Sequence, residues 1–243
     1  TIAYFNSMSY QIEVLEPFGA VINGNGAGVS LGQFQPAEIE TLLKKYKVLV
    51  FKGFDLFPKQ EFALFAQKLG KPMQWEFGAI NELVVKADTE NYIYTDRHVP
   101  MHWDGAFAGT IPHMIVFQCL KAPPRECRGG TTFANTRNIV ENLEANEKKR
   151  WEKISITYTT EKIAHYGGKI TQKLVQKHEL AGDDVIRYAE PVDDLNPVSL
   201  EFHGLKDETE GAFIEKMKGH LYSPKNLYTH HWAAGDIVIA DNY

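Results

Sequence analysis

Two stretches in the first third of the chain repeat their apolar positions with the period of an α-helix. In residues 36–46 the apolar side chains fall at i, i+3, i+4 and i+7, and Pro36 suits a first helical position. A second helix is predicted over residues 59–69, with Gly70 as its stop signal. Between them, the apolar residues 48–51 predict a short buried strand.

After residue 72 the pattern changes to short apolar runs and alternation, which is typical of strands separated by loops. Strands are predicted at 11–22 (one or two), 83–86, 114–120, 131–134, 154–160, 185–188, 227–232 and 236–240, the last two paired around the turn 233–235. Helices are predicted at 138–143, 146–153 and 208–220, a loop at 88–100, a mobile polar segment at 172–184 and a flexible turn at 24–28. We therefore expect a single domain, residues 1–243, that is mainly β with flanking helices and has a barrel-like body.

Composition narrows the choice of partners. The 243 residues are 44% hydrophobic and 23% charged, as in ordinary globular proteins. The formal net charge of −5 argues against nucleic acid or an anionic membrane as a partner. No apolar run approaches the ~20 residues of a membrane span. Two cysteines make no disulfide framework, so a cytoplasmic protein is expected; the oligomeric state is not predicted.

The segment 101–105, Met-His-Trp-Asp-Gly, holds the strongest candidate chemistry. In an extended segment, side chains two apart point to the same side, so His102 and Asp104 could reach one cation. They would supply two-thirds of the 2-His-1-carboxylate set that binds non-haem Fe(II). Taken alone, the pair favours the simpler interpretation, a turn histidine beside a solvated carboxylate.

Four features in a fixed order change this interpretation. They are strand 48–51 followed by Lys-Gly-Phe, the His102-x-Asp104 pair, the run 129–135 (Gly-Gly-Thr-Thr-Phe-Ala-Asn), and the run from Trp232 through 235–242 (Gly-Asp-Ile-Val-Ile-Ala-Asp-Asn). Together they resemble the taurine dioxygenase-like (TauD/TfdA) family of Fe(II)- and 2-oxoglutarate-dependent oxygenases. The resemblance extends from about residue 18 to the end of the chain.

The resemblance implies a double-stranded β-helix (a jelly roll, cupin-like) with the metal in its mouth. It implies that His102 and Asp104 are iron ligands and that Thr132 hydrogen-bonds a carboxylate of 2-oxoglutarate. The cofactors would be Fe(II), 2-oxoglutarate and O2, and the substrate would be hydroxylated or desaturated with release of succinate and CO2. Because ligation needs a neutral imidazole, metal binding should fail on acidification.

One departure from the family pattern concerns the third ligand. The pair Asp241-Asn242 matches the strand end that precedes the second ligand histidine, which should follow about five residues later, with a 2-oxoglutarate-binding Arg beyond it. The sequence stops at Tyr243, so we expect that it lacks its C-terminal segment. The alternative is a third ligand borrowed from His230 or His231.

A narrower resemblance concerns the substrate. Segment 102–107, Ile111-Pro112 and the segment 187–191 (Arg-Tyr-x-Glu-Pro) look like the isocyanide-pathway branch of the family, which acts on tyrosine-isonitrile-type substrates. Candidate substrate contacts are Tyr94, His98 and Lys169, the last on a lid formed by 165–169; packed or solvated roles remain open for them. The competing functions are a catalytically inert jelly-roll protein that binds a small molecule, and a different metalloenzyme on the same scaffold.

Overall fold

The structure is a computed structural model that describes all residues except 1, 6–7, 25–27, 76–77, 90–91, 128 and 164–165. The glycine-rich turn predicted at 24–28 therefore lies largely outside the described residues. The chain forms two compact units. Unit 1 consists of Thr1–Gln74, His113–Phe133 and Leu227–Asn242, and unit 2 of Trp75–Pro112, Ala134–Asn226 and Tyr243.

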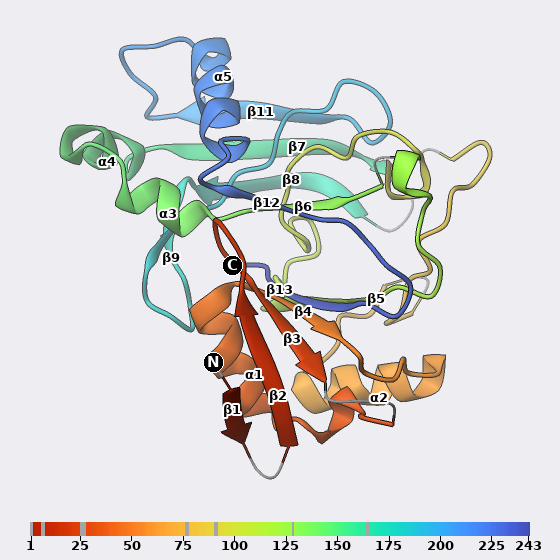
Figure 1. Ribbon diagram of the computed structural model, residues 1–243. Coiled ribbons are helices and arrows are strands. Elements are labelled where there is room, and N and C mark those ends of the chain that lie inside the picture. The colour runs from red at the N-terminus through yellow and green to blue at the C-terminus, as the bar shows by residue number, and fades with distance from the viewer. Residues whose placement is uncertain are drawn as a thin grey trace. The chain divides into compact units, whose positions relative to one another are not determined.

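Unit 1 is built on a six-stranded sheet (Figure 1). Its strands, in sheet order, are β1 (Ile2–Phe5), β2 (Met8–Val14), β3 (Ala20–Gly24), β4 (Val48–Lys52), β13 (Ile237–Asp241) and β5 (Met114–Gln118). Neighbours are antiparallel except for β3 and β4, which are parallel. The C-terminal strand β13 thus lies between strands from the first half of the chain.

The alternating side chains of the central strands bury both faces of this sheet. On β4, Leu49 and Phe51 pack with the helices α1 (Pro36–Tyr46) and α2 (Lys59–Leu69). Val48 and Val50 point to the other face, as strand geometry requires. There they meet aromatic residues of the ribbon formed by β6 (Thr131–Ala134) and β12 (Leu227–His230). Two 3-10 turns complete the unit, η1 (Leu31–Gln33) and η3 (Arg125–Cys127).

Unit 2 contains a three-stranded antiparallel sheet with β7 (Ser155–Ile163) at its centre, flanked by β11 (Val198–His203) and β8 (Tyr166–Lys173) (Figure 1). Ile156 and Tyr158 of β7 enter a core shared with the helices of the unit. The remaining elements are β9 (Val175–Lys177), β10 (Asp184–Ile186), α3 (Thr136–Glu141), α4 (Ala145–Trp151), α5 (Glu210–Leu221) and η2 (Tyr92–Tyr94).

The fold is mainly β with flanking helices, as predicted, and α1 and α2 have the predicted bounds. The predicted hairpin of 227–232 with 236–240 is wrong. β12 pairs with β6, whereas β13 pairs with β4 and β5, so the intervening turn carries the chain from one sheet to another. The reason is that β13 has a partner along each edge, β4 and β5, and so has no free edge for β12. At the turn, the Asp236 carboxylate accepts the Ala233 amide hydrogen (2.9 Å).

Two further local predictions are wrong. Residues 83–86 form no strand, and their three apolar side chains, Leu83, Val84 and Val85, are more than half exposed. The segment 172–184 is ordered into β9 and β10, because Leu174 and Val175 are buried in the core of unit 2. Strands β1, β8 and β11 were not predicted. Both cysteines are free thiols, and within the described residues no helix is long and apolar enough to cross a membrane.

Candidate metal and cofactor site

His102 and Asp104 are brought together in unit 2. The Nε2 atom of His102 lies 3.4 Å from Oδ1 of Asp104, and both side chains are a little under half exposed. The Nδ1 atom lies 2.7 Å from the carbonyl oxygen of Pro100. Because a carbonyl can only accept, Nδ1 donates its proton to Pro100, and Nε2 is the ring nitrogen that faces Asp104.

The segment that carries this pair has no regular secondary structure from Met101 to Gly105. The reversal after Asp104 depends on Gly105, which has a φ of +85°. A Cβ atom there would lie 2.6 Å from the Thr110 carbonyl oxygen and 2.8 Å from Cδ of Pro112. Only glycine combines this backbone conformation with so close an approach. The predicted extended conformation of this segment is therefore wrong: the two side chains converge beside a glycine turn.

Trp103, between the two candidate ligands, points into the core of unit 2. It is 7% exposed, and its ring packs edge-on against Tyr158 at 5.3 Å between centroids. The buried guanidinium of Arg187 lies 5.7 Å from the Trp103 ring. This anchor leaves His102 and Asp104 on the solvent side of the segment.

The electrostatics of the pair favour a cation. Desolvation lowers the pKa of His102, but the hydrogen bond and charge of Asp104, together with the Pro100 carbonyl, outweigh it and raise that pKa above its usual value. The same negative potential attracts a metal ion to Nε2.

The donor set fits iron as far as the described residues extend. Two ligand atoms bound at right angles to one ion, each at about 2.1 Å, would be about 3.0 Å apart, close to the 3.4 Å between Nε2 and Oδ1. Metal-binding histidines commonly donate their other N–H to a carbonyl, as His102 does to Pro100. No group of three or more His, Cys, Asp or Glu side chains that could hold a metal occurs among the described residues.

The alternative third ligand, His230, is already engaged within unit 1. It is 3% exposed, with Nε2 3.0 Å from Oδ2 of Asp236 and Nδ1 3.2 Å from the Tyr228 hydroxyl. The other oxygen of Asp236 accepts from Lys52 Nζ at 2.9 Å. Burial lowers the pKa of His230, so a neutral ring serves this network. His231 is exposed.

Thr132 lies at the centre of β6 in unit 1. Its neighbour Thr131 accepts a hydrogen bond from Trp232 Nε1 (2.9 Å), so the Thr132 side chain points to the opposite side of the strand. The preceding Gly130 is required by packing, because a Cβ there would lie 2.9 Å from Cγ2 of Thr229 on β12. The run 129–132 is therefore fixed against β12.

The three candidate substrate residues have different surroundings in unit 2. Tyr94 is half-buried; its hydroxyl donates to Asn81 Oδ1 at 2.8 Å. His98 is exposed, with Nε2 3.1 Å from the Tyr222 hydroxyl. Lys169 does not lie on a lid loop: it is on β8, paired with Thr159, and its Nζ is 3.8 Å from Glu201 Oε2. Lys169 is not on a loop because it takes part in the antiparallel pairing of β7 with β8. Residue 165, the first of the predicted lid, lies outside the described residues.

Sequence reasoning missed the side chain that holds the segment before His102. Glu190 is 7% exposed; its Oε2 accepts from the Met101 amide (2.7 Å) and from the Tyr222 hydroxyl (2.5 Å). Its own amide donates to the Met101 carbonyl at 2.9 Å. The sequence signal that could have found it is the Glu-Pro pair within 187–191, which belongs to the narrower resemblance.

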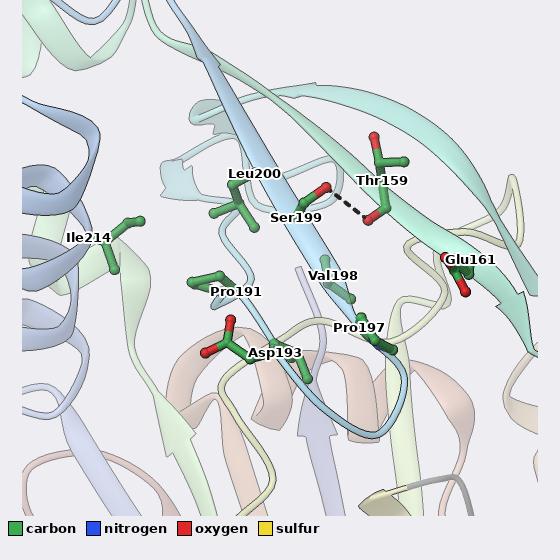
Figure 2. A pocket seen from close by; sticks show the side chains of 10 residues that line it. Thr159, Glu161, Pro191, Asp193, Pro197, Val198, Ser199, Leu200 and Ile214 are labelled. Atoms are coloured by element: carbon green, nitrogen blue, oxygen red, sulfur yellow. Dashed lines mark hydrogen bonds between the residues drawn. The ribbon is translucent and has the colours of Figure 1, made fainter.

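Unit 2 also has a surface pocket of about 590 Å³ beside β11 (Figure 2). It is lined by Thr159, Glu161, Pro191, Val192, Asp193, Pro197, Val198, Ser199, Leu200 and Ile214. In Figure 2 the Ser199 hydroxyl points toward the Thr159 carbonyl, to which it donates at 3.4 Å. None of the predicted site residues lines this pocket.

Comparison with known proteins identifies the class. The model of the taurine catabolism dioxygenase TauD, TfdA family matches residues 11–243. The chain belongs to this family, whose members are Fe(II)- and 2-oxoglutarate-dependent oxygenases. It is accordingly an oxidoreductase that uses Fe(II), 2-oxoglutarate and O2.

The relatives include enzymes named for isonitrile chemistry. The chain is 37% identical to the 3-((Z)-2-isocyanoethenyl)-1H-indole synthase of Fischerella ambigua, over 98% of this chain and 88% of that protein. It is 29% identical to the tyrosine isonitrile desaturase of Pseudomonas aeruginosa, over 93% and 79%. The crystal structure of the PvcB protein from Pseudomonas aeruginosa superposes with a TM-score of 0.80 at 26% identity, covering 100% and 86%. PvcB is described as an Fe, alpha-ketoglutarate dependent oxygenase from an isonitrile synthetic pathway.

Proposed function

We propose that this oxygenase oxidises a small amino-acid-derived isonitrile, such as tyrosine isonitrile or its indole counterpart. The 37% identity to an isocyanoethenyl-indole synthase across nearly the whole chain carries the choice of substrate class. The tyrosine isonitrile desaturase at 29% identity supports the same functional group on a phenol ring. The choice between the two rings is left to experiment.

In this proposal His102 and Asp104 are two of the iron ligands. The support is the 3.4 Å approach of their donor atoms, with the other imidazole nitrogen held by Pro100. Thr132 is assigned to a carboxylate of 2-oxoglutarate. Tyr94 and His98 are assigned to the substrate, and Lys169 to its carboxylate, although Lys169 already faces Glu201. The strands are assigned to a double-stranded β-helix, which a crystal structure of the intact protein would test, and the protein is placed in the cytoplasm.

Bound Fe(II), with 2-oxoglutarate and O2, supplies a two-electron oxidation of the substrate. For desaturation, substrate, 2-oxoglutarate and O2 give the alkene, succinate, CO2 and water. For hydroxylation, the same reactants give the alcohol, succinate and CO2. His102 and Asp104 contribute by holding the metal, and the Pro100 carbonyl contributes by keeping the Nδ1 proton of His102 in place.

The metal and co-substrate are tested on the intact gene product. Anaerobic Fe(II) plus 2-oxoglutarate should give a weak metal-to-ligand absorption band. H102A should abolish the band, whereas H203A should keep it, because His203 bonds Thr157 and no candidate ligand. A wild-type protein without the band would contradict the metal assignment.

The substrate class is tested by supplying tyrosine isonitrile and the indole isonitrile separately with O2. We expect one of them to give succinate in equal amount to a product that has lost two hydrogens or gained one oxygen, as read by mass spectrometry. Succinate at the substrate-free background with both would contradict the isonitrile proposal. Binding of an isonitrile with no succinate would instead support the inert binding protein.

A further inference from the structure

The segment that carries the candidate iron ligands is held by one distant residue, Glu190. Both backbone groups of Met101 bond to Glu190: the amide donates to its carboxylate at 2.7 Å, and the carbonyl accepts from its amide at 2.9 Å. No strand ladder performs this task, since residues 101–105 have no regular structure. Met101 immediately precedes His102, so the position of its backbone determines the position of the His102 Cα atom, from which the imidazole side chain extends.

The Glu190 carboxylate is held in turn by the end of α5. Tyr222 caps that helix and donates its hydroxyl proton to Oε2 of Glu190 at 2.5 Å. That proton is committed, so the His98 Nε2–H at 3.1 Å donates to the Tyr222 oxygen. Burial and the bond to Glu190 raise the pKa of Tyr222, which keeps it a donor. The chain of contacts runs from His98 through Tyr222 and Glu190 to Met101.

We propose that Glu190 is a positioning residue for the iron site, and that Tyr222 orients its carboxylate for that role. The inference rests on the proposed function of His102 and Asp104. Glu190 meets both backbone groups of the residue beside a ligand, the amide through its buried carboxylate and the carbonyl through its own backbone amide. Hydrogen bonds that orient a metal-binding side chain typically change metal affinity about 10–100-fold.

The variants exploit the fact that Met101 and Tyr222 share the same oxygen, Oε2. E190A removes the acceptor, while E190Q can retain one acceptor oxygen at that place. Y222F removes the hydrogen bond that orients it. The matched control is Y188F: Tyr188 is also buried in the core of unit 2, and its hydroxyl has no hydrogen-bond partner among the described residues.

The experiment titrates Co(II), as a spectroscopic stand-in for Fe(II), into the metal-free intact protein and follows the Co(II) absorption. Melting of the metal-free proteins is recorded in parallel. We expect a Co(II) dissociation constant about 10–100-fold larger in E190A. E190Q and Y222F should show a smaller loss with an altered spectrum, and Y188F should match wild type.

The outcomes separate the two proposals. If wild type binds no Co(II) and H102A is indistinguishable from it, the metal site itself is wrong. If wild type binds in a His102-dependent way while E190Q and Y222F bind with unchanged affinity and spectrum, the positioning role of Glu190 is overturned. A folding failure of E190A leaves these two variants to decide, and a loss in Y188F equal to that in Y222F would also overturn the proposal.

Discussion

At the scale of single residues, Gly105 is a position where adding one methyl group should destabilise the protein. Its φ of +85° and the 2.6 Å approach of a Cβ to the Thr110 carbonyl oxygen oppose any side chain. We expect G105A to lower the free energy of unfolding by about 2–4 kcal/mol, from left-handed strain plus a backbone clash. Urea denaturation measures this, and Co(II) titration measures the accompanying loss of metal affinity.

The control for Gly105 lies in the same loop. Gly109 also has a positive φ, +72°, but a Cβ there would meet nothing within 4 Å. G109A should therefore cost only the conformational strain of about 1–2 kcal/mol and leave metal affinity unchanged. Equal losses in the two variants would mean that the close approach at Gly105 is unimportant.

His230 should make the stability depend on pH. Burial lowers its pKa below the usual 6.5, so from pH 6.5 down to the lower folded-state value the unfolded chain binds more protons than the folded one. The contribution of His230 to the unfolding free energy should thus be fully present above pH 6.5, and the unfolding free energy should fall as the pH falls below that value. Urea denaturation at several pH values should show that the unfolding free energy changes less with pH in H230Q than in wild type. Variant H231Q, at the exposed neighbour, should keep the wild-type dependence of the unfolding free energy on pH.

The candidate ligands could be found from sequence, but the residues that support them could not. The spacing of His102 and Asp104 and the glycine that follows are local features. Glu190 is 89 positions from Met101, and Tyr222 is further along the chain. No pattern in one sequence pairs such residues, because their contact depends on the packing of α5 in unit 2.

At the scale of elements, the connection between β12 and β13 depends on Asp236. This 3%-exposed carboxylate accepts from Ala233 N and Lys52 Nζ and lies 3.0 Å from His230 Nε2. We expect D236N to lower the unfolding free energy by about 2–4 kcal/mol; the range is reduced from that of a fully buried pair because the Lys52 side chain is 41% exposed.

A double-mutant cycle with K52M measures that contribution by urea denaturation. K52M alone should cost less than D236N, because it leaves the bonds to Ala233 and His230 in place. The double variant should be more stable than the sum of the single losses implies, since the two charges are coupled. Strict additivity would show that the ion pair contributes nothing and that the turn is held by the other two bonds.

Elements were predictable where their signals were local. Helices 36–46 and 59–69 carry both an apolar period and terminal signals, and the structure has those bounds. Residues 83–86 are rich in β-branched side chains but find no strand partner, since β-propensity depends on context. The partners of β12 and β13 are more than 90 positions away, so the local hairpin signal at 233–235 was misleading.

At the scale of the whole molecule, binding of metal and 2-oxoglutarate should stabilise the folded state. A ligand that binds only the folded protein adds about 2.7 kcal/mol at a hundred times its dissociation constant. For a chain of this length, that corresponds to a rise in Tm of about 5–10 °C. Calorimetry of the intact, metal-free gene product, with Mn(II) and 2-oxoglutarate added under anaerobic conditions, should record the rise.

The variants decide where this stabilisation originates. H102A should lose the rise, because one of the two candidate ligands is gone, while H203A should retain it, since the His203 side chain bonds Thr157 and lies on β11. T132A should keep the rise caused by Mn(II) alone but lose part of the increment from 2-oxoglutarate. A full increment in T132A would remove Thr132 from the co-substrate site, and an undiminished Mn(II) effect in H102A would place the stabilising ion elsewhere.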